Sequence, residues 1–230
     1  MKKIIAAAAA AVLALLSAAG LSAQRNETRR VEDALDVFLQ LVSEPDKQVP
    51  AYMMTNAWGI AILPAVQKAA FVVGGQYGKG ILVGRKTDGA WGSPVFITLK
   101  GGSIGWQIGV QSVDLILFFR TRKSMDGVLG GSFTLGVDAS IAAGSLGRQA
   151  GASTDTDLSA EILSYARARG IFAGLTVAGA TLEIDFDADS LYYGKSVSPD
   201  DILAGKAVGT LPPSAADLAR ELDAYSAARK

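Results

Sequence analysis

The sequence predicts an α+β protein, with a glycine-rich, mainly antiparallel β-sheet or barrel-like body flanked by N- and C-terminal helices. Twelve of the 26 glycines lie between Gly59 and Gly109, among short apolar and β-branched runs such as Ile81-Leu-Val83 and Leu115-Ile-Leu-Phe-Phe119. Glycine provides the backbone freedom that tight turns and bulges need, so such runs indicate closely connected strands. Amphipathic helical patterns precede and follow this region.

The composition describes one globular domain with appendages. The chain has 230 residues, of which 50% are hydrophobic and 19% are charged. This is enough apolar material to bury a substantial core. Cysteine and histidine are absent, which excludes ordinary zinc sites, thiol catalysis and serine hydrolases that rely on an imidazole base. The sequence therefore predicts a non-enzymatic protein with no cofactor and no zinc site.

Residues 1–23 have the pattern of a cleaved secretory signal peptide. A basic start, Met1-Lys-Lys3, precedes the apolar run Ile4–Leu16 and the small residues of Ser17–Ala23. No cysteine is present to carry a lipoprotein acyl chain. We expect a periplasmic or secreted protein, with an uncleaved anchor as the alternative.

The segment 24–49 is expected to hold an N-terminal amphipathic helix. From Gln24 to Val42, apolar side chains recur at helical spacing, and charges fill the opposite side. Such a helix can cap an apolar sheet face or lie on a membrane surface. Ala51–Ala57 predicts one more short helix before the sheet.

The β-rich domain is assigned to residues 50–195. Turns are expected at Thr87-Asp-Gly89 and Gly101-Gly102, a short helical insertion at Ser124–Leu129, and a C-terminal helical tail over 196–230. In that tail, Ser198 is expected to cap a short helix, and Ser214 to be the N-cap of a final helix that reaches Arg229. The predicted strands cover residues 58–63, 69–76, 79–85, 94–100, 104–111, 113–120, 132–143, 157–169 and 171–186.

Four acidic residues alternate along one predicted strand: Glu183, Asp185, Asp187 and Asp189. On an extended strand the first three carboxylates would share one face. A solvated strand face is the simplest interpretation, and a hard cation such as calcium or magnesium is the alternative. The spacing does not match an EF-hand loop, because Ser190 and Ser196 occupy the glycine and glutamate positions.

Basic residues gather on the expected turns. Lysine and arginine at loop tips can simply protect sheet edges and solubility, or they can form a cationic rim for phosphate head groups. The candidate lipid-binding residues are Lys79, Arg85, Lys86, Arg120, Arg122 and Lys123, with Arg25, Arg29 and Arg30 as an auxiliary anchor.

The order of several motifs resembles the SYLF lipid-binding domain family. The motifs lie between about Pro50 and Gly194, and they are the runs Ala57–Pro64, Val72–Gly75, Gly78–Gly80, Trp91–Pro94, Gly105–Gly109 and Gly170–Gly174, with Asp114, Tyr165 and Tyr192-Tyr-Gly194. The resemblance implies a β-dominated domain flanked by helices. It also implies phosphoinositide binding in eukaryotic members, some of which bundle actin, and an exported role for bacterial members. Eukaryotic membrane binding is associated with a basic N-terminal helix, whereas acids follow Arg25, Arg29 and Arg30 here.

We therefore expect a non-enzymatic, exported protein that recognises anionic lipid or a membrane surface. Removal of residues 1–23 leaves 20 basic and 22 acidic residues, a net charge of 20 − 22 = −2, so an anionic partner must meet a local patch. This balance also disfavours nucleic acid. The alternative is a structural or interaction scaffold of the cell envelope that binds a protein partner.

Overall fold

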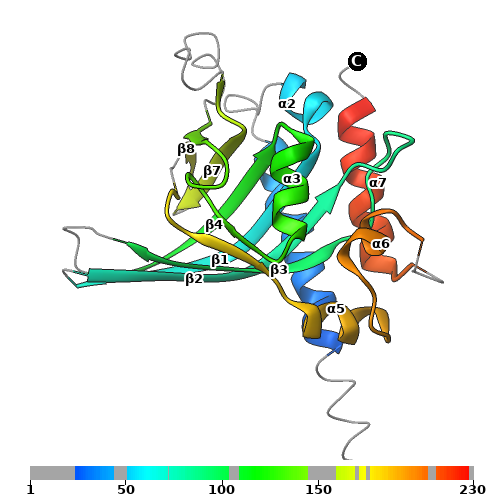
Figure 1. Ribbon diagram of the computed structural model, residues 1–230, viewed down its shortest axis with the longest axis horizontal. Helices are drawn as coiled ribbons and strands as arrows, with labels where there is room; N and C mark the ends of the chain where they lie inside the picture. The colour runs from blue at the N-terminus through cyan, green and yellow to red at the C-terminus, as the bar shows by residue number, and fades with distance from the viewer. Residues whose placement is uncertain are drawn as a thin grey trace, which may run out of the picture.

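The computed structural model describes residues 24–43, 51–71, 73–103, 109–144, 159–168, 171–174, 177–206 and 211–227, and the expected signal peptide lies outside them. In these residues nine strands form one sheet in the order β5-β9-β3-β2-β1-β4-β7-β6, with β8 paired to β7 (Figure 1). The pairing is antiparallel except between β6 and β7. The predicted α+β class, with an antiparallel body and helices at both ends, is confirmed.

Four long strands form the centre of the sheet. They are β1 (Gly59–Phe71), β2 (Val73–Gly84), β3 (Val95–Ser103) and β4 (Gly109–Phe119). β1 replaces parts of two predicted strands, because a bulge at Pro64 and Ala65 lets pairing continue past the proline. Similarly, β4 joins parts of two predicted strands. The expected turn at Gly101-Gly102 is wrong, because both glycines lie in β3 and pair with residues of β2.

The bulge in β1 explains two local features of the sequence. Ala65 adopts a positive φ of 51°, and its N–H donates to the Asp114 carboxylate at 3.0 Å. Opposite the bulge, a Cβ added to Gly80 would lie 2.2 Å from the Ile62 carbonyl oxygen. Only glycine therefore fits at position 80 without a shift of the backbone.

Shorter strands complete both edges: β5 (Ser132–Thr134), β6 (Ile141–Ala143), β7 (Ile162–Ala168), β8 (Ile171–Gly174) and β9 (Thr181–Ile184). The single strand predicted over 132–143 is wrong. Between β5 and β6 the chain turns, and the Asp138 carboxylate accepts a hydrogen bond of 2.6 Å from the Thr134 N–H.

Both faces of the sheet are covered, which is why its strands are apolar at successive positions. Ile60, Ile62, Ile81, Phe96 and Phe118 contribute to one buried cluster, and the intervening residues contribute to a second. We call the first side the sealed face. We call the second side the α3 face, after the helix that packs on it.

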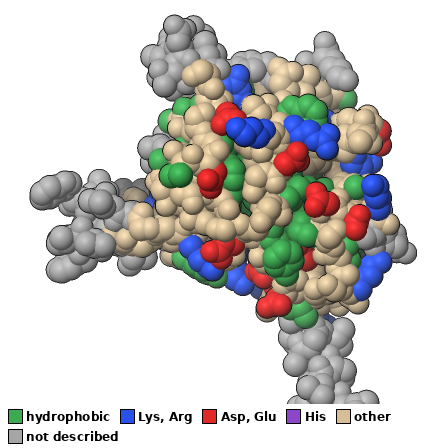
Figure 2. Space-filling view, in the orientation of Figure 1, with side chains coloured by type: hydrophobic (Ala, Val, Ile, Leu, Met, Phe, Trp, Pro, Cys, Tyr) green, Lys and Arg blue, Asp and Glu red, His purple; other side chains and the backbone are tan. Residues whose placement is uncertain are grey.

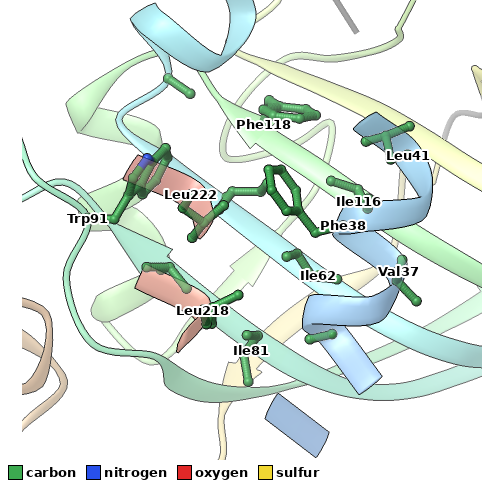
Figure 3. Close-up of a cluster of buried hydrophobic side chains, with 14 of the residues drawn as sticks. Val37, Phe38, Leu41, Ile62, Ile81, Trp91, Ile116, Phe118, Leu218 and Leu222 are labelled. Carbon is green, nitrogen blue, oxygen red and sulfur yellow. The ribbon is translucent and has the colours of Figure 1, made fainter. Parts of the chain in front are cut away.

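Helices from the two ends of the sequence cover the sealed face (Figure 1). The N-terminal helix spans residues 24–43, and α7 spans Pro213–Ala227. Phe38 and Leu41 of the first helix meet the sheet in the same cluster as Leu218 and Leu222 of α7 (Figure 3). In the described part of the chain, no helix combines the length and apolar character needed to span a membrane.

α7 begins one residue earlier than predicted, at Pro213, so Ser214 is not its N-cap. Proline suits the first turn of a helix because its missing N–H has no partner there. Ser214 instead lies inside the first turn, where its hydroxyl is 2.7 Å from the hydroxyl of Tyr192.

On the α3 face, α3 (Arg122–Leu129) and α6 (Pro199–Leu203) supply buried side chains, including Met125 and Ile202. α3 confirms the predicted helical insertion and is capped by Thr121. α6 is capped by Ser198, as predicted. A short α2 (Ala51–Asn56) precedes β1.

The strand predicted over 171–186 is wrong at its C-terminal end. β9 stops at Ile184, and Asp185 caps a helix that the sequence did not reveal, α5 (Phe186–Tyr193). The carboxylate of Asp185 accepts from the Ala188 N–H at 3.2 Å. Asp187 and Asp189 therefore lie in the first turn of a helix, where carboxylates are favoured by the helix dipole.

Candidate functional site

The ends of β1, β2 and β4 bring distant basic residues to one place. The Trp58 N–H donates to the Phe119 carbonyl at 2.8 Å, and the Trp58 carbonyl accepts from the Arg85 N–H at 2.9 Å. The segments that follow β2 and β4 therefore both start beside Trp58. The side chain of Trp58 is 42% exposed, which is unusual for so large an apolar group.

We define the Trp58 end as Trp58, Lys86, Arg120, Arg122 and Lys123. The Arg122 guanidinium lies over the indole, 5.8 Å from the ring centroid, and bonds Asp126 at 3.4 Å. Lys123 is exposed, and Lys86 pairs with Asp88 at 3.2 Å. Arg120 is half-buried and donates to the Ala160 carbonyl at 2.9 Å. Basic side chains border hydrophobic surface near the upper end of α3 in Figure 2.

Arg85, another predicted lipid-binding residue, holds the fold together beside the Trp58 end. Its guanidinium donates to the carbonyls of Met54 and Gly89, both at 2.6 Å, and to that of Ala57 at 3.1 Å. It also stacks on Trp91, 4.3 Å from the ring centroid. Burial lowers the pKa of this guanidinium, although nearby Asp223 opposes the shift. These contacts give Arg85 a structural role, and lipid binding by it stays a prediction.

Lys79 lies elsewhere, in a shallow hollow of about 370 Å³. Its ammonium is 3.3 Å from the Asp185 carboxylate, and the neighbouring Lys100 bonds Glu183 at 2.6 Å. Tyr77 and Phe186 also line this hollow. The fold therefore separates Lys79 from the other predicted basic loops, and each lysine of the hollow already faces a carboxylate.

The N-terminal helix presents its three predicted cations differently. Arg25 and Arg29 are exposed, whereas the side chain of Arg30 is only 12% exposed. Arg30 pairs with Glu27 at 2.8 Å and with Asp185 at 3.3 Å, and it lies over the Phe96 ring. Because the apolar side of this helix packs on the sheet, the sheet-capping alternative is the one the structure adopts.

The acidic run does not form a solvated strand face. Asp185 is tied into the helix cap, and burial would raise its pKa, but the Ala188 N–H, Lys79 and Arg30 together lower it. Asp189 is 1% exposed, and one of its oxygens accepts from the Phe96 N–H at 2.9 Å. Burial raises the pKa of Asp189 to about 7, despite this hydrogen bond. Within the described ranges, no group of three or more acidic side chains is arranged to hold a metal ion.

Sequence patterns alone did not mark Trp58 as the centre of a site. It appeared only within the motif from Ala57 to Pro64, with no sign that Arg122 would lie over it. The available signal was positional, since an aromatic residue preceding a central strand can meet the loops that follow both neighbouring strands. Recognising it would have required the pairing of β1 with both β2 and β4. Guanidinium and ammonium groups beside an exposed indole suit contact with an anionic, amphipathic surface.

Comparison with known proteins gives a consistent result. Residues 100–225 match the family model Ysc84, described as "Las17-binding protein actin regulator". The chain is 32% identical over 205 residues to SH3 domain-containing YSC84-like protein 1 of Homo sapiens, covering 88% of this chain and 59% of that protein. It is 31% identical over 204 residues to Protein YSC84 of Saccharomyces cerevisiae, covering 86% of this chain and 43% of that protein.

The chain thus spans about three fifths of the human relative and two fifths of the yeast one. The family description names a binding and regulatory protein, and neither relative bears the name of an enzyme. The family match begins within β3 and ends within α7, so it contains β4 to β9 and both helices of the α3 face but not β1 or β2. Together with the motif order in the sequence, it shows that this chain belongs to the Ysc84 family, the family of SYLF domains.

Proposed function

We propose that the protein is a non-enzymatic binding module that attaches to anionic lipid surfaces through the Trp58 end. The observation that carries the proposal is the exposed indole of Trp58 with the Arg122 guanidinium over it and Lys123 beside Arg122 in the sequence. An indole is suited to the boundary between water and lipid, where one side of the ring is apolar and its N–H is polar. Cations around it would meet lipid phosphates.

Electrostatics favour a local mode of attachment. Without residues 1–23 the chain carries a net charge of 20 − 22 = −2, so the whole molecule is weakly repelled by an anionic surface. A cation at the surface contributes about 1 kcal/mol of attraction, and salt screens it over a Debye length of roughly 8 Å. Lys86, Arg122 and Lys123 together would supply about 3 kcal/mol, to which insertion of the indole adds an apolar contribution that salt does not weaken.

The test is co-sedimentation with vesicles of phosphatidylcholine alone and of phosphatidylcholine with phosphatidylglycerol, each at low and high salt. Binding is expected on the anionic vesicles at low salt and is expected to fall as salt rises. Trp58→Ala and the double variant Arg122→Ser, Lys123→Ser should each weaken it at least fivefold.

The matched control is Arg220→Ser with Lys195→Ser, which also removes one arginine and one lysine. Arg220 and Arg122 side chains have the same exposed fraction, 65%. Equal losses from the control and from the Arg122 and Lys123 variant would mean that only net charge matters. Binding to neutral vesicles with no response to salt would reject the electrostatic mechanism.

We also propose that the protein is exported and that residues 1–23 are removed. The support is the basic, apolar and small-residue pattern of that segment. Intact-mass analysis of protein recovered from the periplasm and medium should give a chain that starts at or near Gln24. Recovery of the full-length chain from the membrane fraction would favour an uncleaved anchor.

A protein partner is the second candidate, because the family description names Las17 binding and actin regulation. The same Trp58 end could contact an acidic surface on an envelope protein. Failure to bind any vesicle, together with Trp58-dependent capture of one defined partner in crosslinking, would favour this scaffold function over lipid binding.

A further inference from the structure

A polar row crosses three strands of the α3 face. Lys68 of β1 lies opposite Gln76 of β2 on one side and opposite Gln111 of β4 on the other. Directly paired residues on neighbouring strands project from the same face of a sheet, with about 5 Å between their Cβ atoms. Lys68 therefore stands between two side-chain amides.

The row marks the edge of the apolar core on this face. Val66, two residues before Lys68, is fully buried in the α3-face cluster together with Leu99 and Val113. Gln76 is 7% exposed. A Cβ added to Gly101, the partner of Gln76 on β3, would lie 3.1 Å from the Gln76 side-chain amide nitrogen and 2.9 Å from the Ala180 Cα. The turn around Ala180 thus covers one end of the row.

Lys68 is poorly compensated at this position. It is half-buried, and burial lowers the pKa of its ammonium group. The ion pairs formed among the described residues do not include it, in contrast to Lys79 and Lys100 on the opposite face of the same sheet. A partly desolvated ammonium group without a carboxylate is unfavourable unless another anion approaches it.

We propose that Lys68 and Gln111, at the open end of the row, form a binding site for one phosphate group. The ammonium supplies charge and up to three donors, and the Gln111 amide supplies two further N–H donors. Because the two strands are about 4.8 Å apart, both side chains can reach one tetrahedral anion, whereas the amide nitrogen of Gln76 lies toward Gly101 of β3, away from Lys68. The phosphate can belong to a lipid head group or be free in solution.

This site is separate from the Trp58 end. Lys68 follows Trp58 by ten residues, almost all of them in β1, which corresponds to roughly 30 Å at about 3.3 Å per residue. The inference therefore goes beyond the proposed membrane attachment, and either can fail without the other.

The experiment follows the side-chain NMR signal of Lys68 in isotope-labelled protein, with isothermal calorimetry in parallel. The probes are inorganic phosphate and dihexanoyl phosphatidic acid below its micelle concentration. Wild type is compared with Lys68→Met, which keeps most of the apolar stem, and with Gln111→Ala, which changes an exposed residue. Lys79→Met is the matched control on the other face of the sheet.

Wild type should bind at least one probe, with a shift of the Lys68 signal and a rise of its pKa on binding. Lys68→Met should weaken binding at least tenfold and Gln111→Ala about threefold, while Lys79→Met and Trp58→Ala stay within twofold. Lys68→Met should melt no lower than wild type, since it removes an uncompensated charge. Binding of the lipid alone assigns a head group, and binding of phosphate alone assigns a free anion.

The inference is overturned if neither probe moves the Lys68 signal, or if Lys68→Met binds as tightly as wild type. A loss of vesicle binding in Trp58→Ala, with phosphate binding unchanged, would concern only the proposed membrane attachment.

Discussion

The sealed face and the Trp58 end use the same kind of side chain in opposite ways. At the sealed face Arg30 is enclosed by Glu27 and Asp185. Arg85, which stacks on Trp91 of the same cluster, is surrounded by backbone carbonyls. At the Trp58 end, Arg122 and Lys123 remain exposed, and Arg122 has only an exposed pair with Asp126. Arg30 and Arg85 thus join distant elements of the fold, whereas Arg122 and Lys123 are available to a partner.

The difference shows that a cation's role here depends on how many acceptors the fold places around it. Buried and multiply bonded cations are expected to influence stability, because their removal strands carbonyls and carboxylates. Exposed pairs are worth little for stability but keep their charge accessible. Substitutions at the sealed face should therefore change unfolding, and substitutions at the Trp58 end should change binding.

The largest effect is expected from Phe38→Ala at the sealed face. Phe38 is fully buried in the cluster that joins the N-terminal helix to the sheet and α7 (Figure 3). Loss of such a ring typically destabilises a protein by about 3–5 kcal/mol. Urea unfolding is the measurement, and Leu39→Ala, at a 38% exposed position of the same helix, is the control. Equal effects of the two substitutions would show that the helix is not docked as described.

A second test concerns the buried carboxyl group of Asp189 in α5, next to Ala188 of the sealed-face cluster. The folded pKa of Asp189 is about 7, above its ordinary value of 3.8, so rising pH from about 4 to 7 ionises this group in the unfolded chain first. Asp189 therefore removes stability over that range, by up to about 4 kcal/mol at about 1.4 kcal/mol per pKa unit. Asp185, Glu27 and Arg30 face the same group.

Asp189→Asn retains an oxygen for the Phe96 N–H and should remove that loss. The expected result is a variant that gains stability relative to wild type as pH rises from 4 to 8, measured by urea unfolding at each pH. Asp187→Asn, on the exposed side of α5, tests the alternative cause. An equal gain there would assign the effect to the charge of the helix instead of the burial of Asp189.

Arg85→Met should destabilise the protein by about 2 kcal/mol, because it leaves the carbonyls of Met54, Ala57 and Gly89 without their donor. Thermal melting of this variant beside Lys86→Met separates a cation that bonds several carbonyls from a neighbouring lysine that pairs only with exposed Asp88. If Arg85→Met melts like wild type but loses vesicle binding, the residue belongs to the binding surface and not to the framework.

The smallest stability effect is expected at the Trp58 end. Arg122→Ser with Lys123→Ser should change the free energy of unfolding by less than about 0.5 kcal/mol, as is usual for exposed positions. The same double variant should show the vesicle defect described above. A large drop in its melting temperature would remove the contrast between the two regions.

Much of the fold could be predicted from local sequence patterns, and the predictions that were wrong have identifiable physical causes. The N-terminal helix, α3 and α6 were predictable because apolar spacing or a capping residue marks each of them. β1 was divided wrongly because Pro64 usually ends a strand, and only the tertiary pairing shows that a bulge absorbs it. α5 was missed because alternating acids imitate a strand, while Asp185 is in fact a helix cap.

The candidate site was predictable only as a set of residue types. Lysine and arginine on turns indicated an anionic partner. The sequence could not show which of these side chains would form hydrogen bonds and ion pairs within the protein. Arg85 and Arg122 are similar in the sequence and differ only in the acceptors that other segments bring. Lys68 was not among the candidates, because its amide neighbours come from β2 and β4.

The docking of the first and last helices on one face has a consequence for biosynthesis. Leu218 and Leu222 are made about 180 residues after Phe38, yet all three belong to one cluster. A ribosome adds about 5–20 residues per second, so the early helix waits roughly 10–40 s for its partner. Until α7 is made, the part of the sealed face that it covers has no partner, so the N-terminal helix alone cannot complete this cluster.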